Sequence, residues 1–268
     1  MKNVLFILCL TVCTARLHAE DGYRLWLRYD LVRNNERLVQ YRDAISGVQV
    51  LGKSPTLAAA KNELQNGLTG LLGRKPLFQN TIQNGTLVIE TLQASARIAS
   101  LIPNVQKAAA GSEGFIIRTV QQYGKHFTII TANSDVGVLY GVFHFLRLLQ
   151  TERPIRQLLI ITAPKIQHRI LNHWDNLNRT VERGYAGMSI WNWHTLPDYI
   201  DQRYIDYARA NASIGINGTV LTNVNANALV LTKDYLVKVG RRLQIPSVHM
   251  ASGYISRRAS VRLWRSAV

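Results

Sequence analysis

The spacing of hydrophobic and polar residues predicts that the first half of the chain mixes strands and helices. Residues 24–29 alternate polar and apolar side chains, which is the period of a half-buried strand. Residues 57–72 show helical spacing after Ser54, a capping residue, and Pro55, which suits a first helical turn. Further elements expected here are strands at 86–91, 114–119 and 125–131, the last two as a hairpin, and a helix at 133–149. Mixing without strict alternation is typical of an α+β domain.

The pattern changes after residues 152–156, a polar, proline-broken stretch that predicts a linker. Strands are predicted at 169–175 and 218–225, and each ends in polar residues. A helix is expected between them at 196–211, and another begins at Thr232. Strand, helix, strand, helix with short connections indicates parallel βα units.

The first 19 residues have the pattern of a secretory signal. Lys2 supplies a positive start, residues 4–12 form a short apolar run, and Ala19 is a small residue suited to cleavage. A buried N-terminal strand is the alternative. We therefore expect a secreted or periplasmic protein whose mature chain begins near Glu20. Beyond residue 20 no apolar run approaches the roughly 20 residues that cross a bilayer, so no membrane partner is expected.

Composition narrows the classes of partner and cofactor. Both cysteines, Cys9 and Cys13, lie in the leader, which excludes disulfides and cysteine-held metals from the rest of the chain. The net charge of +16 would suit a nucleic-acid partner, but six arginines lie in the acid-free last 28 residues. We therefore expect no nucleic acid, and binding through that arginine-rich end is the third-ranked interpretation. Phosphate-loop, paired-histidine metal and nucleophile-elbow motifs are missing from the sequence, so no cofactor or metal is expected.

The richest candidate chemistry lies between residues 172 and 194. This stretch holds three of the five tryptophans, Trp174, Trp191 and Trp193, among amides, acids and a histidine. Trp174 is at the C-terminal end of a predicted parallel strand, where α/β folds build their sites. An indole covers the C–H face of a sugar while polar groups bond its hydroxyls. Alternatively, the three are packing residues whose N–H groups find local partners.

For the acid and the two asparagines nearby, the sequence allows two interpretations each. Asp175 is the acid at this strand end, and glycoside hydrolysis normally needs two carboxyl groups, so Asp175 is expected to orient its neighbours or bind a hydroxyl. Asn223 and Asn225 end the second strand and either line a pocket wall or form a turn. His173 and His194 are expected to be structural.

Several segments resemble the α-glucuronidases of glycoside hydrolase family 67. The matching stretches are residues 20–30, 114–118, 135–141, 170–177, 181–187, 189–193 and 214–226. The resemblance implies a small α+β domain followed by a (β/α)8 TIM barrel, of which this chain would hold the first two βα units. It also implies that Trp174 lines the uronic-acid subsite and that Val224 lies near the methoxy group of the sugar. Asn223 and Asn225 are added to the substrate-binding set by position alone.

The implied activity is the release of 4-O-methylglucuronic acid, with inversion, from xylooligosaccharides during xylan breakdown. The implied partners are therefore glucuronoxylan-derived oligosaccharides. The family's catalytic carboxylates follow later barrel strands, so no catalytic residue is expected here and the chain by itself is expected to be inactive. The family's dimer interface lies in a C-terminal domain and is expected to be missing as well. A non-catalytic carbohydrate-binding fragment is the alternative.

The predicted organisation has four parts: a signal at 1–19, an α+β domain at 20–155, the start of a TIM barrel at 160–240, and a basic tail at 241–268. The tail has no clear helical or strand period, which indicates out-of-frame translation or a genuine basic arm. Two parallel strands cannot close an eight-stranded barrel. Residues 166–240 are therefore expected to expose apolar surface and unpaired edges, whereas the first domain is expected to fold alone.

Overall fold

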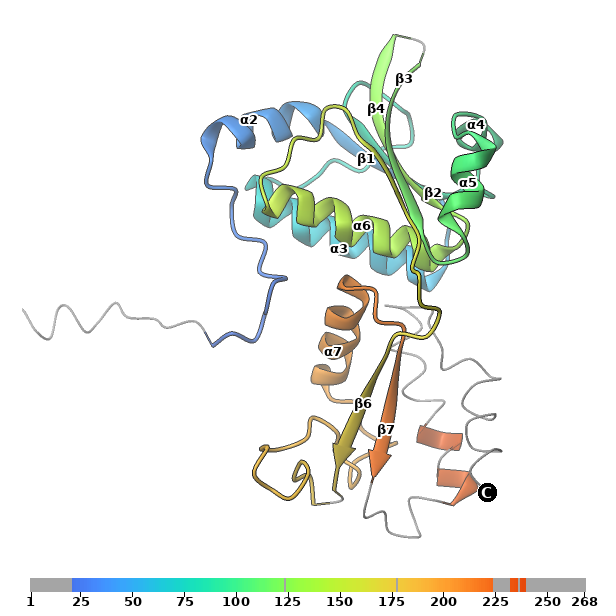
Figure 1. The fold of residues 1–268 in the computed structure, drawn as a ribbon. Helices are drawn as coiled ribbons and strands as arrows, with labels where there is room; N and C mark the ends of the chain where they lie inside the picture. Colours follow the sequence, from blue (N-terminus) through green and yellow to red (C-terminus); the bar gives the residue numbers. More distant parts are fainter. Residues whose placement is uncertain (1–20, 123, 177, 224–231, 236, 240–268) are drawn as a thin grey trace, which may run out of the picture.

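The computed structural model describes residues 21–122, 124–176, 178–223, 232–235 and 237–239 (Figure 1). The predicted leader and basic tail lie outside the described residues. The strands are β1 (Gly47–Val50), β2 (Thr86–Thr91), β3 (Phe115–Gln122), β4 (Lys125–Ala132), β5 (Leu159–Thr162), β6 (Ile170–Asp175) and β7 (Gly218–Asn223). The helices are α2 (Asn35–Ala44), α3 (Pro55–Leu72), α4 (Ala96–Ser100), α5 (Asn104–Ala110), α6 (Asp135–Gln150) and α7 (Gln202–Ser213). Within the described parts of the chain, no helix has both the length and the apolar character needed to cross a membrane.

The first sheet has five strands in the order β1-β2-β4-β3-β5 and is covered on both faces (Figure 1). β1, β2 and β4 are parallel neighbours, whereas β3 is antiparallel to β4 and β5. Phe115 and Ile117 pack with α3 and α6 on one face, and Ile116 packs with α4 and α5 on the other. The domain mixes strands and helices without strict alternation, as predicted, and α3 links the parallel neighbours β1 and β2 as a crossover.

Local signals correctly predict most elements of this domain. The Ser54 side chain accepts a hydrogen bond of 3.1 Å from the Leu57 N–H and so caps α3. Ser134 caps α6 in the same way, with its hydroxyl 3.3 Å from the Gly137 nitrogen. The predicted β3–β4 hairpin is confirmed, and its turn has Gly124 at a φ of +70°, a conformation that glycine adopts without a Cβ clash.

Three expectations about element bounds differ from the structure. Residues 24–29 form a turn and a loop, because Leu25 and Tyr29 have left-handed φ angles of 52° and 55° that a strand cannot contain. β5 pairs with β3, so the first sheet reaches Thr162 and extends past the boundary predicted at residue 155. α7 begins at Gln202 instead of residue 196, because the Asp201 carboxylate caps it by accepting from the Arg203 N–H at 2.9 Å.

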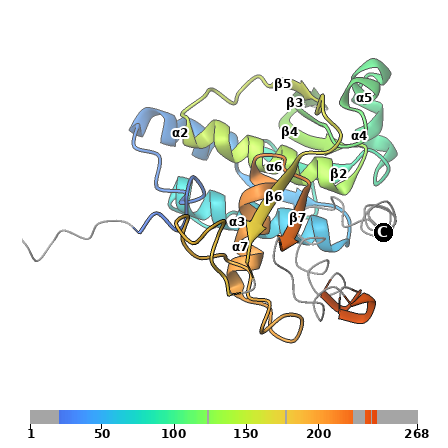
Figure 2. The same cartoon turned by 60° about the horizontal axis from the view of Figure 1, so that its bottom comes forward.

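The second sheet consists of β6 and β7, which are parallel as predicted. α7 packs against one face, where His173 of β6 lies 2.6 Å from the Tyr207 hydroxyl. On β6, Ile170, Leu171 and Trp174 are exposed. This exposure confirms the expected apolar surface on the second half of the chain. Figure 2 shows β6 and β7 side by side, with α7 next to them.

Two ion-pair junctions are among the polar contacts that attach the second sheet to the first domain. At one, buried Glu63 of α3 accepts two hydrogen bonds of 2.8 Å from the guanidinium of Arg209 on α7, and one of 2.5 Å from the Tyr29 hydroxyl. At the other, Glu113 lies 2.5 Å from Arg169, next to the start of β6. The carboxyl ends of β6 and β7 therefore point away from the first domain (Figure 1).

Candidate functional site

The candidate site lies at the carboxyl end of β6, where a long loop leaves the strand (Figures 1 and 2). Trp174 is the last but one residue of β6, and 54% of its surface is exposed. The strand register places Trp174 opposite Thr222 of β7. Trp174 thus stands at a parallel strand end, as predicted, with its side chain accessible to a ligand.

Trp191 and Trp193 have the alternative role of packing residues. They are only 3% and 7% exposed and belong to a small apolar cluster with Leu196 and Tyr204. The rings of Trp191 and Tyr204 lie 4.7 Å apart between centroids. Among the described residues neither indole N–H has a hydrogen-bond partner, so the expected local partners are not found there. Of the three tryptophans, Trp174 therefore remains as the candidate for contact with a sugar.

Asp175 orients its neighbours, which confirms one of its two predicted roles. Its buried carboxylate accepts a hydrogen bond from the Ser189 hydroxyl. Ser189 Oγ in turn accepts from the backbone N–H of Trp191 at 2.9 Å. His173 Nδ1 lies 3.9 Å from Asp175 Oδ2, and burial lowers the pKa of the imidazole while the carboxylate opposes that shift. Asp175 and His173 act together as a support beneath the loop.

The amide positions at the end of β7 are placed only in part. The register pairs Asn223 with Asp175, one position beyond the Trp174–Thr222 pair. Asn223 therefore lies beside Asp175 along the strand instead of beside Trp174. Val224 and Asn225 lie outside the described residues, so their roles stay predictions.

The loop after β6 contains features that sequence reasoning missed. The Asn176 amide donates to the Thr180 carbonyl at 3.1 Å and to the Glu182 carbonyl at 2.6 Å. The Glu182 N–H donates to the Trp174 carbonyl at 2.9 Å, which brings the loop back beside the strand end. Tyr185 projects from the loop and is 78% exposed. A tyrosine between two turn-forming glycines, Gly184 and Gly187, was the available sequence signal.

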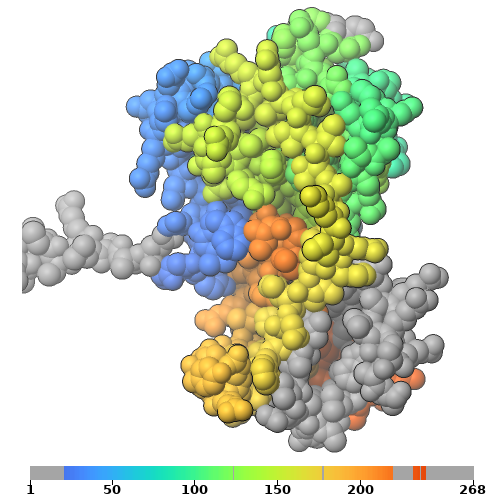
Figure 3. Space-filling model, viewed as in Figure 1, coloured from blue at the N-terminus to red at the C-terminus, as the bar shows by residue number. Residues whose placement is uncertain are grey.

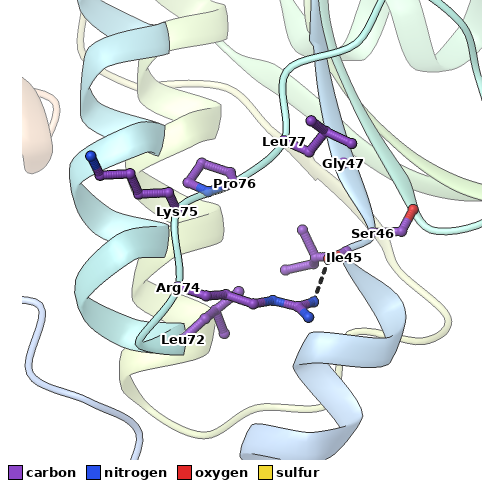
Figure 4. Close-up of a pocket in the computed structure, with 8 residues that line it drawn as sticks. All are labelled: Ile45, Ser46, Gly47, Leu72, Arg74, Lys75, Pro76 and Leu77. Atoms are coloured by element: carbon purple, nitrogen blue, oxygen red, sulfur yellow. Dashed lines mark hydrogen bonds between the residues drawn. The ribbon is translucent and has the colours of Figure 1, made fainter.

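The described residues offer no cluster of metal ligands, and a small pocket lies in the first domain. No group of three or more His, Cys, Asp or Glu side chains in them could hold a metal ion. A shallow pocket of about 180 Å³ lies beside the start of β1 (Figure 4). Its lining residues are Ile45, Ser46, Gly47, Leu72, Arg74, Lys75, Pro76 and Leu77. The guanidinium of Arg74 donates to the backbone carbonyls of Arg42 and Ile45, so this cation serves the fold.

Comparisons with known proteins place both halves of the chain in one family. The Glycosyl hydrolase family 67 N-terminus matches residues 25–145, and the Glycosyl hydrolase family 67 middle domain matches residues 148–256. The probable alpha-glucuronidase A of Aspergillus oryzae is 32% identical over 229 residues, which cover 83% of this chain and 26% of that protein.

Other curated relatives give the same result. The probable alpha-glucuronidase A of Aspergillus terreus is 34% identical over 83% of this chain and 26% of its own length. The alpha-glucuronidase A of Emericella nidulans is 26% identical over 88% of this chain and 28% of its own length. The chain thus spans about a quarter of the length of the curated relatives it matches. From these matches we conclude that the chain belongs to glycoside hydrolase family 67.

Proposed function

We propose that this chain supplies the first part of the substrate site of an exported α-glucuronidase that acts on xylan-derived oligosaccharides. The single observation that carries the proposal is the exposed Trp174 at the carboxyl end of β6, within the family's middle domain. In this position an indole can cover the apolar face of a sugar ring. The substrate is the 4-O-methylglucuronic acid branch on short xylose chains, and the signal-like residues 1–19 support export.

The second sheet corresponds, in this proposal, to the start of a (β/α)8 barrel. β6 and β7 are parallel and are connected through α7, which is the repeating unit of such a barrel. Parallel strands are normally buried on both faces, yet Ile170 and Leu171 of β6 are exposed. These exposed positions are where further strands and their side chains would pack.

In this proposal, substrate binding and hydrolysis belong to different parts of the longer family protein. Inverting hydrolysis uses two carboxyl groups about 6.5–9.5 Å apart that flank the scissile bond. At the end of β6 the described carboxylate, Asp175, is buried and engaged with Ser189. We therefore propose that the 268-residue chain binds the branched sugar without hydrolysing it.

The test compares release and binding with the full chain. Wild-type protein and Trp174→Ala are incubated with 4-O-methylglucuronosyl-xylotriose, and free uronic acid is measured by chromatography while binding is measured by calorimetry. We expect no release, and a loss of affinity of roughly two- to twelvefold in Trp174→Ala, because one aromatic stacking contact is worth roughly 0.5–1.5 kcal/mol. Hydrolysis by the purified chain, or equal affinity of the two proteins, would contradict the proposal.

A further inference from the structure

The segment that precedes α2 contacts both halves of the chain, and the candidate site described above does not include it. Toward the first domain, the Gln150 side chain of α6 donates to the Trp26 carbonyl at 2.8 Å, and Leu27 is buried in the core. Toward the second half, the Trp26 indole N–H donates to the buried Ser213 hydroxyl of α7 at 2.7 Å. In the space-filling view, blue atoms from the start of the chain lie beside orange atoms of the second half (Figure 3). The segment therefore bridges the first domain and α7.

Two more residues of this segment, each three positions from Trp26, are linked to the same helix. The Tyr23 hydroxyl donates to the Asp206 carboxylate of α7 at 2.6 Å. The Tyr29 hydroxyl donates to Glu63 at 2.5 Å, and the same carboxylate accepts from Arg209 of α7. Positions 23, 26 and 29 thus all lead to α7, directly or through one shared carboxylate.

The residues of α7 that receive these contacts lie on one face of the helix. Asp206, Arg209 and Ser213 are three and four positions apart, which is the spacing of neighbours along a helix face. Tyr204 and Tyr207 are about half a turn away and therefore lie on the opposite face. α7 thus has one face toward the segment and another toward the second sheet.

The opposite face of α7 supports the candidate site. The Tyr207 hydroxyl lies 2.6 Å from Nε2 of His173, the residue before Trp174 on β6. The Tyr204 hydroxyl accepts from the backbone N–H of Asn192 at 2.9 Å, in the loop that returns from the strand end. Because a helix moves as one rigid element, a displacement of one face of α7 also displaces the strand and loop held by the other.

The backbone of the segment is shaped for this contact. Leu25 and Tyr29 have left-handed φ angles of 52° and 55°, which residues with a side chain rarely adopt. Such conformations persist where surrounding contacts hold them. Here the bonds of Tyr23, Trp26 and Tyr29 hold the backbone on both sides of these positions.

We propose that residues 21–29, which we call the N-terminal strap, position the candidate site through α7. The strap holds α7 against the first domain, and α7 in turn sets the place of β6 and of the loop at Asn192. Tyr23 and Trp26 are thus positioning residues that act without touching the sugar, and a site fixed in advance loses less entropy on binding. The inference rests on the proposed function, because the strand end that the strap positions is the proposed sugar site.

The first measurement is hydrogen exchange of the full chain without sugar. Trp26→Phe removes the indole donor and keeps a ring, and Ser213→Ala removes its acceptor. Each should speed exchange of the α7 amides about fivefold, the size expected from one lost hydrogen bond, while β2 is unchanged. The double variant should exchange no faster than Ser213→Ala alone, because both changes break the same contact. Tyr199→Phe, which alters an exposed tyrosine outside the strap, is the control and should match the wild type.

The second measurement reads the strand end itself. The imidazole ¹⁵N chemical shifts of His173 should move in Trp26→Phe and in Asp206→Ala. Asp206→Asn keeps an oxygen that accepts from Tyr23, so its shifts should stay near those of the wild type. In calorimetry with 4-O-methylglucuronosyl-xylotriose, Trp26→Phe should bind roughly two- to fivefold more weakly than the wild type.

The outcomes separate this inference from the proposed function. Unchanged α7 exchange and unchanged His173 shifts in Trp26→Phe would overturn the inference and leave the proposed function standing. The inference also fails if Trp26→Phe binds the branched ligand as tightly as the wild type while Trp174→Ala binds it more weakly. If α7 and His173 change in Trp26→Phe but the wild type binds no sugar, the proposed function fails and the hold of the strap on β6 is supported.

Discussion

Strands β2 and β6 are both six residues long and parallel to a neighbour, yet their environments are opposite. β2 lies inside the five-stranded sheet, and its first five residues are buried. β6 has a described neighbour on one side only, α7 covers one of its faces, and most of its residues are exposed. Parallel strands normally carry apolar side chains on both faces, and neither face suits contact with solvent. The comparison therefore shows that the burial of such a strand depends on the layers that pack around it.

The two regions also differ in what holds them in place. The first domain has apolar clusters on both faces of its sheet. The second sheet is attached to that domain through the Glu63–Arg209 and Glu113–Arg169 ion pairs, and Ala212 of α7 is buried in the first domain's core. We therefore expect the first domain to be the more stable unit and the second sheet to depend on it.

Breaking the junction at Glu63 should give the largest effect. Arg209→Ala leaves the buried Glu63 carboxylate without its cation, and removing one partner of a buried pair costs about 3–5 kcal/mol. Hydrogen exchange should speed up in β6, β7 and α7 while β2 stays protected.

Two further variants make this result specific. Arg203→Ala, on the exposed side of the same helix, should leave the exchange rates unchanged. The double variant Glu63→Met with Arg209→Met should recover most of the protection, because an apolar pair can replace a buried ion pair. Equal acceleration in β2 and β6 would show that the two regions unfold as one.

An identical substitution in each sheet tests the comparison directly. Ile89→Ala in β2 removes a fully buried side chain and should cost about 2–5 kcal/mol of unfolding free energy, measured by urea denaturation. Ile170→Ala in β6 removes a side chain that is 39% exposed, and it should cost less than about 1 kcal/mol. Similar costs for the two variants would contradict the difference in burial.

A pH dependence is expected that originates in the first domain. Burial raises the pKa of Glu90 from 4.5 to about 7, and among the described residues neither of its carboxylate oxygens has a hydrogen-bond partner. Because the folded state binds this proton more tightly than the unfolded state, the Glu90 contribution to stability is lost as the pH rises from about 4.5 to about 7.

Glu90→Gln should remove this dependence and make the protein more stable than the wild type by roughly 3 kcal/mol at pH 8. Thermal unfolding followed by circular dichroism between pH 4 and pH 8 measures it. Asp135→Asn, an exchange at a helix terminus outside the sheet, is the control. Parallel pH profiles of the wild type and Glu90→Gln would refute this assignment.

The sequence predicts where helices and strands lie better than it predicts which residues are buried or in contact. Ser54 and Pro55 fixed the start of α3, since a cap acts on the backbone within one turn. The alternation at 24–29 predicts a strand, but these residues form a turn and a loop, in which Leu27 and Tyr29 are buried against the first domain's core. The pairing of Glu63 with Arg209 joins residues 146 positions apart, and no local sequence pattern predicts it.

The candidate site likewise has features that the sequence predicts and features that only the tertiary structure shows. Its position at the end of a parallel strand and the presence of Trp174 were determined by the sequence. Tertiary structure alone decided that Trp174 is exposed while Trp191 and Trp193 are buried, and that the loop turns back to bring Glu182 beside Trp174. Periodicity and capping act over a few residues, whereas exposure and side-chain contact depend on which distant segments fold against one another.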